Sequence, residues 1–154
     1  MKKIFFFVFL FIQTCSVWAN VVVFSAIPSL TDSCQYVIGP WEGTGLVSGS
    51  FIGIPFTCRY HGEGQISGAV DSEQVSTEIH LQKEAGMFCP EHETVSLSGT
   101  CHQGVITLQA KDADLHGTLS EDGQSAEMAG TVGIDAMGQH IVTNVHDMHL
   151  HKKY

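Results

Sequence analysis

Basic side chains are scarce in this sequence, which has seven lysines and arginines against sixteen aspartates and glutamates. A protein that binds nucleic acid needs a basic surface to neutralise the phosphates, and docking on anionic lipid needs the same kind of surface. The composition therefore argues against both kinds of partner. The excess of acid keeps a domain soluble and attracts cations.

Long hydrophobic runs are also missing. The longest apolar stretch, Ile4–Ile12, is too short to cross a bilayer as a helix. It follows two lysines and precedes the small-residue cleavage site Val17-Trp18-Ala19, an order typical of a secretory signal peptide. We therefore expect residues 1–19 to be removed. The mature chain then begins at Asn20, has no membrane anchor, and is exported to the periplasm or the extracellular space.

Cysteine pairs at the short C-x2-C spacing of zinc sites are absent. The mature chain keeps four cysteines, an even number in an exported protein, and this predicts two disulfides. The four are Cys34, Cys58, Cys89 and Cys101.

The apolar period of an amphipathic helix is absent from the mature chain. From Trp41 onward, short β-branched or alternating runs are separated by glycine-containing turns, which predicts antiparallel strands joined by hairpins. The expected strands are 41–47, 51–60, 65–70, 75–83, 94–101, 105–110, 113–119, 125–132 and 140–151. The expected turns include 48–49, 61–64, 103–104, 121–123 and 137–138, with Asp122-Gly123 as the strongest hairpin signal.

Four of these strands share the pattern apolar–small–glycine–small–apolar, in which glycine lies on the same face as the apolar ends and lets a strand bend. A meander of eight or nine strands leaves two unpaired edges unless it closes. We therefore predict an all-β fold, a single antiparallel meander that closes into a small up-and-down β-barrel over residues 39–154, after a lead-in segment at 20–38. A β-sandwich is the alternative. The expected inward side chains are Trp41, Ile66, Leu81, Leu97, Leu115 and Met128.

The meander order also predicts how the cysteines pair. With a turn at 61–64, Cys58 and the loop around Cys89 lie at the same end of the sheet, within reach of one another. Cys34 is then left to pair with Cys101. In this arrangement those two cysteines lie at opposite ends, so the lead-in segment has to cross the barrel.

The first expected strand opens with Gly39-Pro40-Trp41-Glu42-Gly43-Thr44-Gly45. This G-x-W-x-G-x-G pattern resembles the entry signature of lipocalins and avidins, in which the tryptophan packs across the closed end of the barrel. It also resembles the opening of nitrobindin-type barrels, which hold haem through a histidine. The resemblance implies a small calycin-type barrel with Trp41 as its plug.

The C-terminal strand concentrates histidines in the segment His146-Asp147-Met148-His149-Leu150-His151. Because side chains alternate along a strand, Asp147, His149 and His151 share one face. Two imidazoles and a carboxylate are suitable ligands for a divalent metal such as zinc or copper, and His146 is a further candidate. A haem would instead use an inward His146 with Met148 nearby. The alternative is that these histidines are solvated residues on an outer face.

Catalytic motifs are absent, because the sequence contains neither G-x-S-x-G nor H-E-x-x-H. We therefore predict an exported, non-enzymatic binding protein with no assigned cofactor, whose barrel interior or mouth holds a small apolar or amphipathic molecule. One alternative is a metal- or haem-binding protein that uses the C-terminal histidines. The other is a structural or interaction module with a filled barrel.

Overall fold

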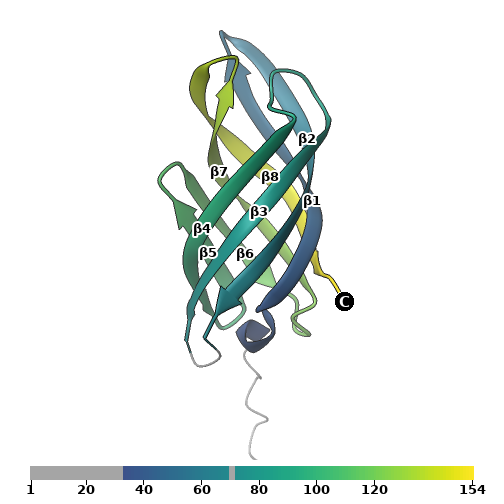
Figure 1. The fold of residues 1–154 in the computed structure, drawn as a ribbon, viewed down its shortest axis with the longest axis vertical. Helices are drawn as coiled ribbons and strands as arrows, with labels where there is room; N and C mark the ends of the chain where they lie inside the picture. The colour runs from purple at the N-terminus through teal and green to yellow at the C-terminus, as the bar shows by residue number, and fades with distance from the viewer. Residues whose placement is uncertain (1–32, 70–71) are drawn as a thin grey trace, which may run out of the picture.

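The computed structural model describes residues 33–69 and 72–154 and shows a closed barrel of antiparallel strands (Figure 1). A 3-10 helix, η1 (Ser33–Tyr36), precedes the barrel. The strands follow one another in chain order, and the last pairs with the first. They are β1 (Gly39–Phe51), β2 (Ile54–Gly68), β3 (Gln74–Ala85), β4 (His92–His102), β5 (Val105–Ala110), β6 (Ala113–Leu119), β7 (Ser125–Ala136) and β8 (Gln139–Lys152). The predicted all-β meander and its closure are confirmed.

The predicted signal peptide and most of the lead-in segment lie outside the described residues. Within 33–69 and 72–154, no helix has the length and apolar character needed to cross a membrane.

The barrel has two ends with different contents. We call the end that carries the β1–β2 turn (52–53), the β3–β4 loop (86–91) and the β7–β8 turn (137–138) the upper end, as it stands in Figure 1. The lower end carries η1, the β4–β5 turn (103–104) and the β6–β7 turn (120–124).

The structure has one strand where the sequence predicted two, at 51–60 and 65–70. The predicted turn at 61–64 is wrong, because these residues lie within β2. Gly62 and Gly64 lie among the residues that line the barrel interior, and a Cβ at Gly62 would come within 2.8 Å of Cδ2 of Leu81. Glycine at this position lets two neighbouring strands curl closely together instead of ending the strand. The predicted turn at 48–49 likewise lies within β1, and the chain turns instead at Ile52-Gly53.

The other hairpin predictions are confirmed. Gln103-Gly104 and Met137-Gly138 each form a two-residue turn in which both residues have positive φ, as a type I′ hairpin requires. Asp122-Gly123 lies in the connection between β6 and β7, with Gly123 at φ 66°.

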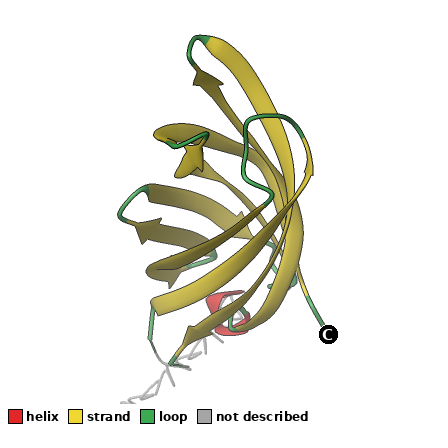
Figure 2. Cartoon of the chain, turned by 45° about the horizontal axis from the view of Figure 1, so that its top comes forward, coloured by secondary structure: helices red, strands yellow, loops and turns green. Residues whose placement is uncertain are grey.

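Both predicted disulfides, Cys58–Cys89 and Cys34–Cys101, are confirmed. The expected crossing of the barrel by the lead-in segment is wrong. Because β2 is continuous, β1 rises from the lower end, and η1 lies there beside the end of β4 (Figure 2). Cys34 therefore reaches Cys101 directly, and the bond fastens η1 to the barrel.

The hydrophobic core occupies the barrel interior. Of the six side chains expected to face inward, five are buried and the sixth, Leu81, is half-buried and packs against the others. Alternation along each strand places these residues inside and polar residues outside.

Candidate functional site

The barrel interior is almost filled. Its cavity measures about 90 Å³ and is lined by apolar side chains from all eight strands, including Trp41, Ile106 and Leu115. Sites for small molecules are commonly about 300–1,000 Å³. The interior as it stands therefore does not hold a ligand of that size.

Two buried polar side chains of the barrel are hydrogen-bonded to the protein itself. Trp41 Nε1 donates to the Val37 carbonyl at 2.7 Å, and Thr143 Oγ1 donates to the Val132 carbonyl at 2.7 Å. The first of these bonds joins the tryptophan at the lower end to the residue that follows η1. These polar groups of the interior thus serve the packing of the barrel.

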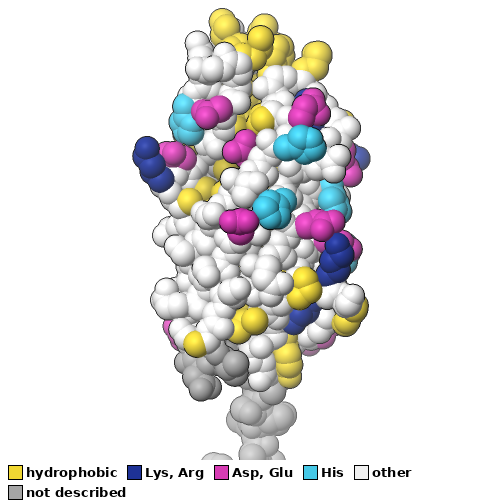
Figure 3. Space-filling model, viewed as in Figure 1, with side chains coloured by type: hydrophobic (Ala, Val, Ile, Leu, Met, Phe, Trp, Pro, Cys, Tyr) yellow, Lys and Arg dark blue, Asp and Glu magenta, His cyan; other side chains and the backbone are white. Residues whose placement is uncertain are grey.

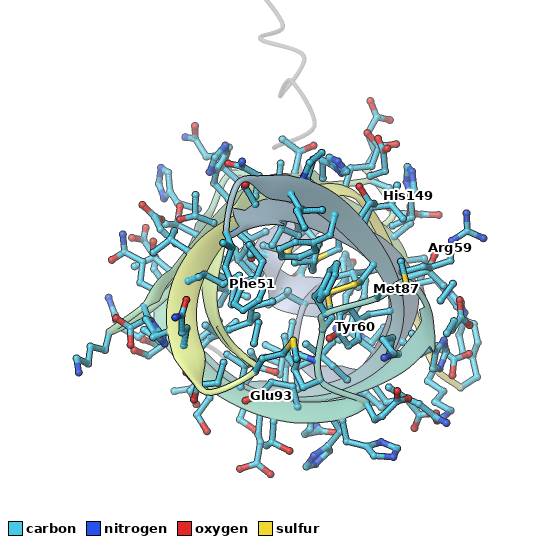
Figure 4. All side chains as sticks on the ribbon, turned by 90° about the horizontal axis from the view of Figure 1, so that it is seen from above. Phe51, Arg59, Tyr60, Met87, Glu93 and His149 are labelled. Carbon is cyan, nitrogen blue, oxygen red and sulfur yellow. A yellow bond between two sulfur atoms is a disulfide. The ribbon has the colours of Figure 1, made fainter. Side chains whose placement is uncertain are left out.

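An aromatic cluster closes the upper end. The rings of Phe51 and Phe88 stack at a centroid distance of 5.7 Å, and Phe56 meets Phe88 edge-on at 6.4 Å. The disulfide between Cys58 and Cys89 fastens the loop that carries Phe88 to the wall. Figure 4, a view from above, shows Phe51 and Tyr60 inside the ring of strands and Arg59 and His149 outside it.

Exposed apolar side chains gather at the tips above this cluster (Figure 3). Ile52, Met87 and Met137 are 78%, 73% and 74% exposed, and Ile54 and Val142 lie near them. Ile52 and Met137 also occupy turn positions with φ of 51° and 50°. The left-handed region disfavours large side chains and β-branched ones most of all, and asparagine or glycine is the usual choice there.

A groove of about 450 Å³ lies between loop 86–91 and the β7–β8 turn. Met87, Phe88 and Met137 give it an apolar wall, and Lys83 and Asp135 supply its charged groups. The Lys83 side chain is only 14% exposed, and its ammonium donates to the Cys89 carbonyl at 3.1 Å and meets the Glu91 carboxylate at 2.6 Å.

Tyr60 lies directly opposite Lys83 on the neighbouring strand, and its hydroxyl donates to the Pro90 carbonyl at 2.7 Å. Burial, together with the nearby carboxylates of Glu93 and Glu91, raises the pKa of Tyr60 to about 12. The neutral phenol thus holds loop 86–91 down on the barrel.

We expect the Tyr60 phenol to ionise near pH 12. Because this folded-state pKa lies above the ordinary value of 10.0, the neutral phenol stabilises the fold at lower pH, and that contribution is lost as the pH rises from 10.0 to about 12. The measurement is the ultraviolet titration of phenolate in the protein minus that in Y60F, together with urea unfolding at both ends of this interval. A difference titration centred at the ordinary value would contradict the burial of this hydroxyl.

The structure places the predicted metal-binding residues of β8 on the outer wall without gathering them. His149 Nδ1 lies 3.6 Å from Glu127 on β7, and His151 Nε2 lies 3.0 Å from Glu42 on β1. Asp147 is exposed and has a φ of 50°, at a β-bulge where β8 slips in register against both neighbours. The set of His146, Asp147, His149 and His151 stays a prediction.

The bulge also decides where His146 lies. The inward residues are Val145 on one side of the bulge and Met148 on the other, and both line the cavity, whereas His146 does not. Its Nε2 lies 3.4 Å from Ser48 Oγ on β1, and its buried Nδ1 has no hydrogen-bond partner among the described residues. The inward placement required for a haem ligand is therefore not what the structure shows.

A different group of metal-ligating side chains comes together on the outer wall. Among the described residues, the ligand atoms of Glu42, His61 and Glu63 lie within 4.8 Å of one another. This group was not predicted from the sequence, because His61 and Glu63 were expected in a turn. A continuous β2, in register with β1, is what brings them beside Glu42.

No protein-family model matches the sequence, and no curated protein matches it. Among solved structures, the chain is similar to the S-type phycobiliprotein lyase CPES from Guillardia theta, with 12% sequence identity and a TM-score of 0.37. The match covers 79% of this chain and 91% of the lyase chain.

The prediction that this protein is not an enzyme is contradicted by that comparison, because the similar structure is a lyase. Identity and TM-score are both too low to transfer the lyase's activity to this chain. The class defined by the structure itself is a closed, eight-stranded, disulfide-bonded β-barrel, as the strand pattern predicted.

Proposed function

We propose that this protein is exported and binds a small amphipathic ligand at the upper end of its barrel. The observation that carries the proposal is the placement of Ile52 and Met137, two large, exposed apolar side chains, at turn positions that disfavour them. Backbone strain of this kind costs about 1–3 kcal/mol per residue and clusters at functional sites. Neither side chain is buried in the core, so contact with a ligand is the role that accounts for both.

The shape and composition of the groove support the same proposal. Its volume of about 450 Å³ is in the usual range for a small molecule, whereas the interior cavity is below it. Methionines such as Met87 and Met137 are flexible and adapt to apolar surfaces of varied shape. The ligand's apolar part therefore lies on the tips, above the aromatic cluster.

Lys83 defines the polar part of the ligand. The Lys83 side chain is nearly buried, whereas the side chain of its partner Glu91 is 71% exposed. Because Glu91 is so exposed, its carboxylate can move away from Lys83. An anionic head group can replace the Glu91 carboxylate as the partner of the Lys83 ammonium. A neutral head group would leave that ammonium without a counter-charge. We therefore propose an anionic amphiphile as the ligand class.

Asparagine substitutions at the turns test this proposal. I52N and M137N should each raise the free energy of unfolding by about 1 kcal/mol, because asparagine accepts positive φ. Each should weaken binding of the anionic probe 8-anilinonaphthalene-1-sulfonate about fivefold, because apolar contact area is lost. Gln103, with a φ of 49°, occupies the equivalent turn position at the lower end, so Q103N is the matched control: it should stabilise the protein and leave binding unchanged.

Urea unfolding and a fluorescence titration give both quantities for each variant. K83M, which keeps the apolar stem of the side chain, should weaken the binding of the probe more than either turn variant does. Unchanged affinity in I52N, M137N and K83M would overturn the proposal. Failure of the wild-type protein to bind the probe would do the same, and it would favour an interaction module with a filled barrel.

A further inference from the structure

Two carboxylates face each other on the outer wall of the barrel. Glu42 on β1 and Glu63 on β2 are directly opposite in the strand register. Like charges at this position destabilise a sheet. A cation is therefore needed between them, and the protein supplies one from its C-terminal end.

That cation is the ammonium of Lys153, which follows β8. Its Nζ lies 3.1 Å from Glu42 Oε2 and 3.1 Å from Glu63 Oε2. Glu63 and His61 also line an outer hollow of about 340 Å³ on β2, β3 and β4. The position between the carboxylates is open to solvent.

Two imidazoles flank the same position. His61 Nε2 lies 3.7 Å from Glu63 Oε1, and His151 Nε2 lies 3.0 Å from Glu42 Oε1. His151 is directly opposite Glu42 on β8, so three adjacent strands contribute the four side chains. The three ligand atoms that lie within 4.8 Å of one another are those of Glu42, His61 and Glu63, and His151 adjoins them through its contact with Glu42. His149 instead lies beside Glu127.

We propose that Glu42, His61, Glu63 and His151 form a binding site for a divalent transition-metal ion, and that Lys153 occupies it when the metal is absent. This site is separate from the proposed ligand groove, so the proposal goes beyond that function. Two ligand atoms at ~2.1 Å from one ion are at most ~4.2 Å apart. The ligand atoms of Glu42, His61 and Glu63 already lie within 4.8 Å of one another, and small rotations of exposed side chains close the difference.

The donor set selects the class of metal. Imidazole nitrogen together with carboxylate oxygen suits zinc, copper and nickel, and a histidine–glutamate set is a common zinc environment. Calcium and magnesium prefer sites built wholly from oxygen. The four cysteines of the described residues do not contribute, because they are paired in disulfides.

Lys153 distinguishes this site from casual binding to surface histidines. A metal has to displace the ammonium, so removal of the ammonium should tighten metal binding. We expect K153M to bind Zn²⁺ about fivefold more tightly than the wild type. This factor corresponds to the energy of the two exposed ion pairs that the metal must break in the wild type. Lys111 lies exposed between β5 and β6, and K111M, which removes the same charge there, should leave the affinity unchanged.

The experiment is isothermal titration calorimetry of the purified full protein, without a histidine tag, with zinc chloride alone. H61A should weaken the affinity for Zn²⁺ more than ~10-fold, and H149A and H116A should leave that affinity unchanged. Excess magnesium should not compete. Circular dichroism of each variant shows that the barrel remains folded, which is expected because these side chains lie outside the core.

Three results would overturn the proposal. The first is Zn²⁺ affinity that is equal in K153M and the wild type. The second is loss of binding in H149A with no loss in H61A, which would assign the metal to the predicted set of C-terminal histidines. The third is absence of Zn²⁺ binding in both the wild type and K153M.

Discussion

The double variant C34A/C101A is expected to lose about 4 kcal/mol of free energy of unfolding relative to the wild type. The two cysteines are 67 residues apart in sequence, so the disulfide removes a large loop-closure entropy from the unfolded chain. It also fastens η1 to the lower end of the barrel, where Val37 packs in the core and accepts the hydrogen bond from Trp41. Urea unfolding of the oxidised proteins measures the difference.

The wild-type protein with its disulfides chemically reduced is the control for the effect of the substitutions themselves. The reduced wild type should lose at least as much stability as C34A/C101A, because it lacks both disulfides. A loss of less than ~1 kcal/mol in C34A/C101A would contradict the role of this bond in holding η1 to the barrel.

Trp41→Ala is expected to cost about 4 kcal/mol, in the range found for removal of large aromatic side chains from cores. The side chain is 4% exposed and fills the lower end beside the cavity. Trp41→Phe keeps most of the apolar contact and removes only the hydrogen bond to the Val37 carbonyl, so it should cost about 1–2 kcal/mol. Thermal or urea unfolding separates the two variants.

Equal stability of W41A and W41F would contradict this account, because it would mean that the indole's volume contributes nothing at the lower end. A second check is the fluorescence of Trp41. Its emission should be that of a buried indole in the folded protein and should shift to longer wavelength on unfolding.

The sequence was enough to predict the fold, because alternation and hairpin turns are local signals. The turns at Gln103-Gly104 and Met137-Gly138 could be predicted from the two turn residues alone. The segment 61–64 could not, because glycine signals a turn in a flexible segment and a bend in a barrel wall equally well. Only the cross-strand contact of Gly62 with Leu81 shows which of the two applies.

The candidate sites were less predictable, because each depends on the register between distant strands. The pairing of Glu42 with Glu63 and His151 joins three strands, and no local pattern specifies it. The bulge at Asp147 reverses the alternation of β8, so a simple strand placed His146 on the wrong face. The upper end did have a signal: Ile52-Gly53 and Met137-Gly138 put a large apolar residue where a type I′ turn prefers asparagine.

We propose that a ligand is held at the upper end while the interior stays filled. Amide chemical-shift mapping by NMR, during titration of the labelled protein with 8-anilinonaphthalene-1-sulfonate, tests it most directly. We expect shifts confined to the turn at 52–53, the loop 86–91 and the turn at 137–138, with Lys83 included. Shifts centred on deep interior residues such as Ile106, Leu108 and Leu115, with the upper tips unchanged, would contradict it.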